Sequence, residues 1–403
     1  MKVAVMGYGT VGSGVCEVIE THQDTLAKRT GGKALELARI LDLREFPGDK
    51  HEALFTKDFN DILNDPEIQI VAETMGGVNP AFDFTMKLLA SGKSVVTSNK
   101  ELVAQKGPEL LACAKAHNVN YLIEASVGGG IPIIRPLNYS LTAEKIEAIN
   151  GILNGTTNYI LSKMEKEGAD FAAVLKEAQD KGYAERNPEA DVEGYDACRK
   201  IAILSSLMFS KNVDSEKVPT EGITKITAAD FEYANATDHT IKLLGRSRAI
   251  DDNTAEVMVA PFLLSKEHPL AMVHGVFNAV FVTGNMLGDS MYYGRGAGKL
   301  PTASAVVSDV VDCARHQGKV IMCFWDKEEV KLADIGEAER SFFIRAKAGA
   351  EDAVTAAFPG GRMVHLKDRK EDFGYFTQSM KEKDFQAKYE ALGEQMLGRI
   401  RLV

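Results

Sequence analysis

Lys2-Val-Ala-Val-Met-Gly-Tyr-Gly-Thr-Val-Gly12 is the stretch of sequence that decides the fold. Residues 2–6 form a mainly apolar run that is typical of a buried strand. Three glycines follow with the spacing G-x-G-x-x-G, and the apolar pattern over 11–26 then predicts a helix. A strand, a glycine loop and a helix in this order form the context in which such a loop binds the pyrophosphate of a dinucleotide.

Each glycine of this loop has a physical reason to be there. Gly7 permits a tight turn, Gly9 lets the backbone approach the pyrophosphate, and Gly12 lets the helix pack on the strand. Thr10 and Val11 open the helix, where backbone N–H groups and the helix dipole favour a phosphate. The alternatives are a packing turn or a loop for a different nucleotide.

Outward from the loop, apolar runs alternate with helical patterns. Strands are predicted over 35–43, 68–72, 94–97 and 120–125, and helices over 81–90 and 108–117. This alternation predicts βαβ units and a mainly parallel, Rossmann-type sheet. Asp42, near the end of the second strand, suits the ribose hydroxyls of NAD, whereas Arg44 suits the 2′-phosphate of NADP. The spacing favours neither cofactor, and solvated loop charges remain the alternative.

The pattern changes after residue 127. Gly128-Gly129-Gly130 followed by Ile131-Pro132 indicates a domain junction. Residues 326–340 are charged and predict a linker, and the order β-α-β-β-α-β expected from 341 onward is that of a small ferredoxin-like domain. We therefore expect an α/β protein with a nucleotide-binding domain over 1–130 that 298–325 completes, an α+β substrate-binding and dimerisation domain over 131–297, and a C-terminal domain over 338–403.

Composition excludes several classes of function. A net charge of −10 argues against bulk binding to nucleic acid or to anionic lipid. The five cysteines show neither CxxC pairing nor metal-ligand spacing, which favours a reducing compartment. No stretch approaches the roughly 18–20 apolar residues of a membrane-spanning helix. The sequence predicts a cytoplasmic protein with no nucleic-acid or membrane partner.

The segment 178–200 carries the predicted chemistry. The pattern over 195–208 predicts a helix on which Asp196 and Lys200, four residues apart, share a face. Beside a buried stripe, Asp196 would fix the Lys200 ammonium, which could give a proton to a developing alkoxide. Pro188 predicts a loop over 185–191. From spacing alone, an ordinary surface ion pair remains the alternative for Asp196 and Lys200.

The spacing A-x3-G-Y-A-E-x-N-P-x2-D-V-x-G-x-D-x3-K over 178–200 resembles the signature of homoserine dehydrogenases. Other blocks that resemble this family stand in the same order, and together they span about 7–315. They are Gly7–Gly12, Glu73–Gly77, Ser98-Asn99-Lys100, Glu124–Pro132, Gly151–Asn158 and Gly294–Gly298 followed by Pro301–Ala305. No single block would suffice, but their joint order is specific.

The resemblance implies reversible reduction of L-aspartate 4-semialdehyde to L-homoserine with NADPH or NADH, in the biosynthesis of threonine, methionine and isoleucine. It implies that Lys200 is the proton donor, and that Lys100 lies between nicotinamide and substrate. Glu185, Asp191 and Asp196 are the implied substrate-binding carboxylates. Further residues taken over from the family's motifs are Gly155 and Thr156 for the substrate, and Thr74, Ser98, Lys100, Gly182, Gly296 and Gly298 for the cofactor.

The resemblance also implies a structural Na⁺ or similar ion at the domain junction. The matching ligands are Glu124 and the backbone carbonyls of Val127, Gly129 and Ile131. The alternative is that the glycines form a hinge and that Glu124 is only hydrogen-bonded. A homodimer or homotetramer is implied in the same way.

The C-terminal domain is similar to the amino-acid-sensing ACT type, which many family members carry. Where an Asp-x-Pro-Gly-like turn is usual, this chain has Lys347-Ala-Gly-Ala-Glu-Asp352. This departure puts ligand binding by the first loop in doubt, so we predict little or no inhibition by threonine.

Two other classes compete with the dehydrogenase. A nucleotide-sensing or scaffold protein would have kept the fold and lost catalysis, but Lys100, Glu185, Asp196 and Lys200 are all present. A thioester-forming aldehyde dehydrogenase needs a nucleophilic cysteine. Cys198 lies on the apolar stretch of a helix, and we interpret it as core packing.

Overall fold

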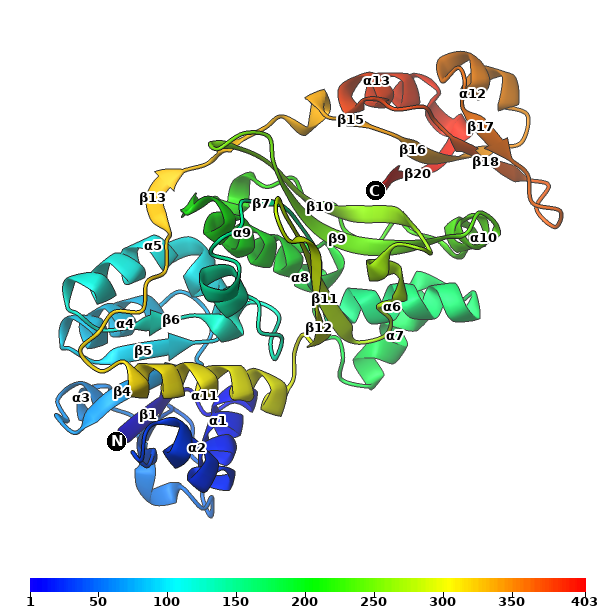
Figure 1. The fold of residues 1–403 in the computed structure, drawn as a ribbon. Coiled ribbons are helices and arrows are strands. Elements are labelled where there is room, and N and C mark those ends of the chain that lie inside the picture. Colours follow the sequence, from blue (N-terminus) through cyan, green and yellow to red (C-terminus); the bar gives the residue numbers. More distant parts are fainter. The chain divides into compact units, whose positions relative to one another are not determined.

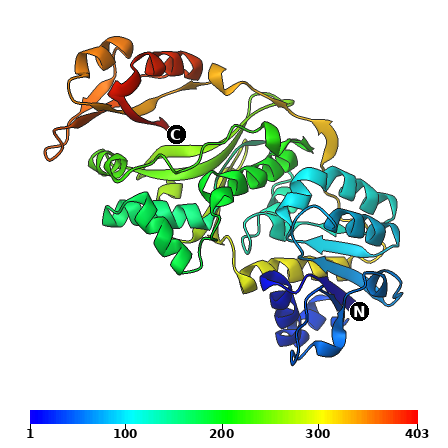
Figure 2. The ribbon, with the colours of Figure 1, turned by 180° about the vertical axis from the view of Figure 1, so that it is seen from behind.

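The computed structural model describes residues 1–403, and the chain forms two compact units (Figures 1 and 2). Unit 1 comprises Met1–Ile146, Ala202–Glu216 and Thr283–Val330, and unit 2 comprises Glu147–Ile201, Lys217–Val282 and Lys331–Val403. No helix combines the length and the apolar character needed to cross a membrane.

Unit 1 contains a six-stranded parallel sheet in the order β3-β2-β1-β4-β5-β6. This order is that of dinucleotide-binding doubly wound folds. Its strands are β1 (Lys2–Met6), β2 (Glu36–Leu41), β3 (Phe55–Thr56), β4 (Ile68–Glu73), β5 (Ser94–Thr97) and β6 (Tyr121–Leu122). The parallel, Rossmann-like sheet predicted from the alternating pattern is therefore confirmed.

Helices cover this sheet, and one of them comes from far along the chain. The helices of unit 1 are α1 (Thr10–Thr21), α2 (Gln23–Arg29), α3 (Asn60–Leu63), α4 (Ala81–Ala90), α5 (Lys100–Ala116) and α11 (Lys299–Arg315). Helix α11, yellow in Figure 1, lies beside α1, blue in the same view. Their contact is close because Gly14 has no side chain: a Cβ there would lie 2.8 Å from the Lys299 carbonyl oxygen. Val15 and Val306 are fully buried in the core that α1 and α11 share.

Three predicted elements of unit 1 differ from their expected bounds by several residues. The helix expected over 11–26 ends at Thr21, and a second begins at Gln23, whose side chain donates to the Leu35 carbonyl (2.8 Å). The helix expected over 108–117 already begins at Lys100 and runs through Pro108. The strand expected over 120–125 is limited to β6, because a 3-10 helix starts at Glu124.

Unit 2 is built on a second, mixed sheet, in which strands run in the order β11-β7-β9-β10-β20-β16-β18-β17. The strands of its first half are β7 (Ile146–Ile152), β9 (His239–Ala249), β10 (Thr254–Ser265) and β11 (Phe277–Gly284). Strands β9 and β10 form a long antiparallel pair, in which Ala255 faces Ala249 and Ser265 faces His239. The helices are α6 (Gly155–Glu167), α7 (Phe171–Asp180), α8 (Glu189–Val192), α10 (Ala228–Ala236) and the first part of α9 (Tyr195–Phe209), which belongs to unit 1 from Ala202 onward.

The C-terminal part of unit 2 has the predicted order β-α-β-β-α-β. Its elements are β16 (Phe342–Lys347), α12 (Glu351–Ala357), β17 (Arg362–Val364), β18 (Asp372–Phe376), α13 (Glu382–Ala391) and β20 (Met396–Leu402). The sheet is antiparallel, and its core stacks Phe342 on Phe385 with ring centroids 3.6 Å apart. Strand β20 also pairs in parallel with β10, where Phe262 faces Arg401. The main sheet of unit 2 therefore continues into this part.

The charged segment 326–340 is not a plain linker. Strand β13 (Asp326–Glu329) pairs with β8 (Lys211–Asn212). Strand β14 (Lys331–Leu332) pairs with β10, and β15 (Glu339–Arg340) pairs with β19 (Met380–Lys381). The segment does connect the two units, since unit 1 ends at Val330 and unit 2 resumes at Lys331. Its short strands were not predicted because charged residues lack the apolar alternation by which strands are recognised.

Candidate cofactor and substrate sites

The glycine loop of unit 1 is shaped by the absence of side chains. Gly7 has φ +90°, and a Cβ on it would lie 2.9 Å from the Thr74 carbonyl oxygen. A Cβ on Gly12 would lie 1.8 Å from the Gly7 carbonyl oxygen, a distance far shorter than any non-bonded contact. Around Gly9, by contrast, no atom lies within 4 Å of such a Cβ. The loop is thus closed at Gly7 and Gly12 and open at Gly9, which fits a pyrophosphate approaching the backbone there.

Thr74 and Asp42 hold this loop from the neighbouring strands. The Thr74 hydroxyl lies 3.0 Å from the Met6 carbonyl and 2.8 Å from the Gly7 carbonyl, to which it donates. The Tyr8 N–H donates to Asp42 (2.8 Å), and Arg44 pairs with the same carboxylate (2.8 Å). Hydrogen bonds from Arg44 lower the pKa of Asp42 to about 2, although burial opposes this. The two residues form one ion pair at the end of β2, in which the Asp42 side chain is 9% exposed and the Arg44 side chain is 62% exposed. The alternative of a solvated loop charge therefore still holds for Arg44.

Ser98 and Lys100 lie at the next strand end, where β5 passes into α5. Asn99 caps α5 by accepting the Leu102 N–H (3.1 Å), and its amide donates to the Gly77 carbonyl (2.6 Å). Beneath them the fully buried Glu73 accepts the Thr97 hydroxyl (2.6 Å). Burial raises the pKa of Glu73, while this hydrogen bond and others lower it. Glu73 thereby fixes the ends of β4 and β5, a role that the sequence pattern did not reveal.

Gly296 and Gly298 lie before α11. Gly298 is the N-cap of α11 with φ +130°, a conformation that favours glycine. The Gly296 carbonyl lies so close to Gly129 that a Cβ on Gly129 would be 2.4 Å from its oxygen. The two glycine segments therefore pack backbone to backbone within unit 1.

The candidate cation ligands surround a buried carboxylate. Glu124 is 2% exposed and accepts the N–H groups of Ile133 (2.7 Å), Ile134 (3.0 Å) and Arg135 (2.8 Å). Burial raises its pKa, and the charge of Arg135 opposes the rise. Three hydrogen bonds use three of the roughly four acceptor positions of a carboxylate. The hinge alternative, in which Glu124 is only hydrogen-bonded, is compatible with the same contacts.

In unit 2 Lys200 and Asp196 form a buried ion pair. The ammonium of Lys200 lies 2.6 Å from the Asp196 carboxylate and 2.8 Å from the Leu153 carbonyl oxygen. Lys200 is 8% exposed and Asp196 is 4% exposed, so the pair is largely shielded from water. The alternative of an ordinary surface ion pair is therefore wrong. Spacing could not decide this, because it does not say which face of α9 is buried.

Asn154 joins this pair to Asp191. Its amide nitrogen donates to Asp191 (2.7 Å) and to Asp196 (2.9 Å), and its amide oxygen accepts the Thr157 N–H at the start of α6 (2.8 Å). One side chain thus caps a helix and holds two carboxylates in place. Sequence reasoning missed Asn154, although an asparagine ahead of a helix was a visible cap signal.

Asp191 does not lie in a loop as predicted. It belongs to the short helix α8, which starts after Pro188, because proline accommodates a helix start. Glu185 does lie outside helices and is exposed. No contact joins Glu185 to the Asp196–Lys200 pair, and its carbonyl accepts the Gln179 amide (3.0 Å).

Three further predicted residues of unit 2 lie at helix ends. Gly155 is the first residue of α6, where a Cβ would lie 2.8 Å from the Val276 carbonyl oxygen. Thr156 donates its hydroxyl to the Tyr183 carbonyl (2.6 Å). Gly182 has φ +73° just after α7, as is common for a glycine that ends a helix. Cys198 is buried in α9, as predicted for core packing.

A parallel sheet in the order 3-2-1-4-5-6, a dinucleotide loop and a buried lysine–aspartate pair together define a nicotinamide-dependent oxidoreductase. Family models agree with this class and identify one family within it. The model "Homoserine dehydrogenase, NAD binding domain" matches residues 7–124, and the model "Homoserine dehydrogenase" matches residues 132–311.

Similar proteins agree with these models. The chain is 49% identical over 322 residues to a homoserine dehydrogenase of Synechocystis, covering 77% of this chain and 73% of that protein. It is 45% identical over 320 residues to one of Bacillus subtilis, covering 77% and 72%. A solved homoserine dehydrogenase of Thiobacillus denitrificans matches with a TM-score of 0.91 at 36% identity, covering 100% of this chain and 98% of that one. The chain belongs to the homoserine dehydrogenase family.

Proposed function

We propose that the chain catalyses the reversible reduction of L-aspartate 4-semialdehyde to L-homoserine, as a step toward threonine, methionine and isoleucine. The observation that carries this proposal is the shielded Asp196–Lys200 pair, held with Asp191 by Asn154. The test is the absorbance of reduced nicotinamide formed from L-homoserine and NAD⁺ or NADP⁺. Absence of any reduced nicotinamide with either cofactor would overturn the proposal.

Lys200 is the proton donor in reduction and the base in oxidation. When bound, the reduced nicotinamide supplies the hydride for the aldehyde carbon. Negative charge then develops on the carbonyl oxygen, and the Lys200 ammonium stabilises it and gives the proton. Asp196 keeps the ammonium oriented at 2.6 Å, and the shielding of the pair strengthens this electrostatic effect.

The polar ends of the substrate are bound by carboxylates of unit 2. Glu185 and Asp196 bind the amino and hydroxyl ends of homoserine, and Asp191 supports the same cluster through Asn154, which donates to both Asp191 and Asp196. Gly155 and Thr156 line the start of α6 beside this cluster.

The nicotinamide cofactor binds to unit 1 through Gly7–Gly12 and through residues at the neighbouring strand and helix ends, namely Thr74, Ser98, Lys100, Gly296 and Gly298. Gly182 is a further proposed cofactor residue, taken over from the family's motif. An archaeal homoserine dehydrogenase solved in complex with NADPH matches 77% of the chain with a TM-score of 0.66 at 27% identity. In this chain we propose NADP or NAD as the cofactor. Asp42 accepts the ribose hydroxyl of NAD, and Arg44 turns to the 2′-phosphate of NADP.

A monovalent cation such as Na⁺ is the proposed structural ion of unit 1. Glu124 has about one acceptor position left after its three hydrogen bonds. The carbonyls of Val127, Gly129 and Ile131 supply neutral oxygens, a donor set that suits a hard ion of low charge. We expect the melting temperature to rise when Na⁺ replaces a bulky organic cation at constant ionic strength. An unchanged melting temperature would contradict the site.

The assembly and the tail complete the proposal. Residues 298–325 complete the nucleotide-binding domain, an idea supported by the core that α1 and α11 share. A homodimer or homotetramer is supported by exposed apolar side chains in and just before β12 (Gly288–Arg295), among them Leu287, which is 59% exposed.

The tail is an ACT-like domain whose first loop gives little or no inhibition by threonine. Light scattering and an activity assay at millimolar threonine test these points.

A further inference from the structure

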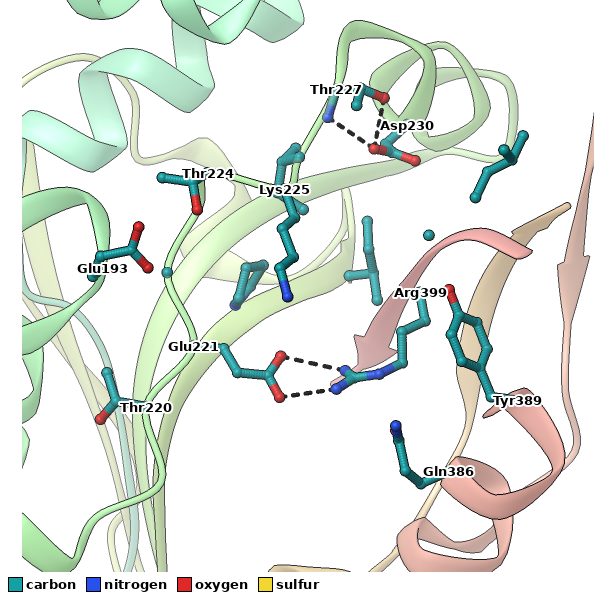
Figure 3. A pocket seen from close by; sticks show the side chains of 16 residues that line it. Glu193, Thr220, Glu221, Thr224, Lys225, Thr227, Asp230, Gln386, Tyr389 and Arg399 are labelled. Carbon is teal, nitrogen blue, oxygen red and sulfur yellow. Dashed lines mark hydrogen bonds and ion pairs between the residues drawn. The ribbon is translucent and has the colours of Figure 1, made fainter. Parts of the chain in front are cut away.

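A polar pocket of about 720 Å³ lies within unit 2, beside β20. Its walls come from the segment 220–230, in the first half of unit 2, and from β20 and α13, in the C-terminal part (Figure 3). Nothing in the proposed reaction uses it. Its volume lies within the range of about 300–1,000 Å³ that holds drug-sized ligands.

Most charged side chains of this pocket form ion pairs, but one cation and one anion do not. Glu221 is paired with Arg399 (3.0 Å) and with Arg401 (2.7 Å). Asp230 is likewise paired, with Arg345 (2.8 Å). Lys225 and Glu193 have no ion-pair partner, and Figure 3 shows the Lys225 side chain extending into the pocket while Glu193 borders it from another wall.

Neutral groups occupy the remaining walls. The Gln386 amide and the Tyr389 hydroxyl come from α13, and Figure 3 shows both directed into the pocket. Ile226, Leu397 and Ile400 add apolar surface. A multiply charged anion is unsuited to this lining, because Lys225 is the one positive charge outside an ion pair and Glu193 would repel the anion. A ligand with one positive and one negative charge matches it.

We propose that this pocket binds an α-amino acid with an extended side chain. The carboxylate of the ligand pairs with Lys225 and its ammonium with Glu193, while the side chain runs along the apolar wall toward Gln386. A small amino acid such as threonine would fill only a fraction of the volume, so this site is separate from the first loop of the tail.

The pocket is linked to the residues of the proposed reaction by a short path. Glu193 directly follows α8, which carries Asp191. The Ile223 N–H donates to the Val192 carbonyl (2.8 Å), and a Cβ on Gly222 would lie 2.2 Å from that carbonyl oxygen. A ligand that bridges Lys225 and Glu193 therefore ties the segment 220–225 more firmly to α8. This part of the inference rests on the proposed function, and we expect the KM for homoserine to change at least twofold.

Calorimetric titration of the full chain tests the binding. The extended probes are L-methionine, L-glutamine and L-phenylalanine, and the small ones are glycine and L-threonine. At least one extended probe should bind once per chain with a millimolar or tighter Kd, and the same molecule without its amino group should bind at least tenfold more weakly. Lys225→Ala and Glu193→Gln should each weaken binding at least tenfold. Lys347→Ala, which removes another exposed lysine of the same unit, should not.

The outcomes separate the two proposals. Failure of every extended probe to bind, or binding that Lys225→Ala leaves intact, overturns the pocket. A binding probe that leaves the KM unchanged overturns the link to α8. Intact probe binding in a chain that shows no dehydrogenase activity supports the pocket and contradicts the proposed function instead.

Discussion

The glycine loop of unit 1 and the Asp196–Lys200 cluster of unit 2 are built in opposite ways. The loop owes its shape to missing atoms, since a single carbon added to Gly12 would lie 1.8 Å from the Gly7 carbonyl oxygen. The cluster owes its chemistry to atoms that are present, since Asn154, Asp196 and Lys200 are joined by hydrogen bonds of 2.6 to 2.9 Å. A backbone site should therefore fail when atoms are added, and a side-chain site when they are removed.

The sharpest test removes the ammonium from the cluster. Lys200→Met should lower kcat by between about a hundred- and ten-thousand-fold, because the developing alkoxide loses its proton donor. Binding of reduced nicotinamide, followed by its fluorescence, should stay within twofold of wild type. Lys163→Met is the matched control, since Lys163 pairs with Glu177 on α6 and α7, and its kcat should be normal. A fully active Lys200→Met enzyme would refute the role of Lys200.

The converse test adds one carbon to the loop at two positions. Gly12→Ala should lower the free energy of unfolding by about 1–3 kcal/mol through overpacking, and weaken cofactor binding with it. Gly9→Ala has open space, so chemical denaturation should show unchanged stability while the cofactor Kd rises at least tenfold. Equal losses of stability in both variants would contradict the assignment of Gly9 to the pyrophosphate.

Asn154 tests whether the cluster depends on more than its ion pair. Asn154→Ser retains a good helix cap but loses the amide that donates to Asp191 and Asp196. Hydrogen bonds to charged groups are worth about 1.5–3 kcal/mol each, so kcat/KM should fall about ten- to hundredfold. The melting temperature should also fall, because the buried Asp196 loses a donor. Steady-state kinetics with normal kcat/KM would show that Asn154 has a structural role only.

Substitutions of Asp42 and Arg44, at the edge of the loop, should change kcat/KM by a smaller factor. Asp42→Ala should lower kcat/KM with NAD⁺ about tenfold, because the ribose hydroxyl loses one charged acceptor. Arg44→Ala should lower kcat/KM with NADP⁺ by a similar factor. The ratio of the two cofactor efficiencies therefore moves in opposite directions in the two variants, and a shift in the same direction would contradict both roles.

The smallest expected effect comes from an ion pair that water reaches. Burial raises the pKa of Glu221, but its pairs with Arg401 and Arg399 outweigh this and lower it to about 2. A lowered folded pKa stabilises the protein above the unfolded pKa, and this stability is lost as the pH falls from about 4.5 toward 2. Because the side chain is 41% exposed, solvent screening limits the contribution to about 1 kcal/mol. Glu221→Gln should lose it at pH 7, and denaturation curves of variant and wild type should converge near pH 2.

The sequence predicted the backbone site better than the side-chain site. Glycine spacing and strand periodicity located the loop, because both are local properties of the chain. The burial of Lys200 was not predictable, because spacing on α9 leaves open which face is covered. Strand β9 was not predicted because Lys242 and Arg246 interrupt its apolar pattern. In the structure Lys242 is nevertheless fully buried and donates to the Val273 carbonyl (2.7 Å). Asn154 was missed because its links to Asp191 and Asp196 span 37 and 42 residues.

The parallel pairing of β20 with β10 has a consequence for folding. Phe262 and Arg401 face each other across a long separation in sequence, so this pairing closes a large loop and belongs to the slow class of contacts. During synthesis part of the edge of β10 stays uncovered until β20 has been made. An uncovered strand edge can pair with other chains, so this stage is prone to aggregation. Once the strands pair, the sheet runs unbroken into the C-terminal part, so unit 2 should melt in one cooperative transition.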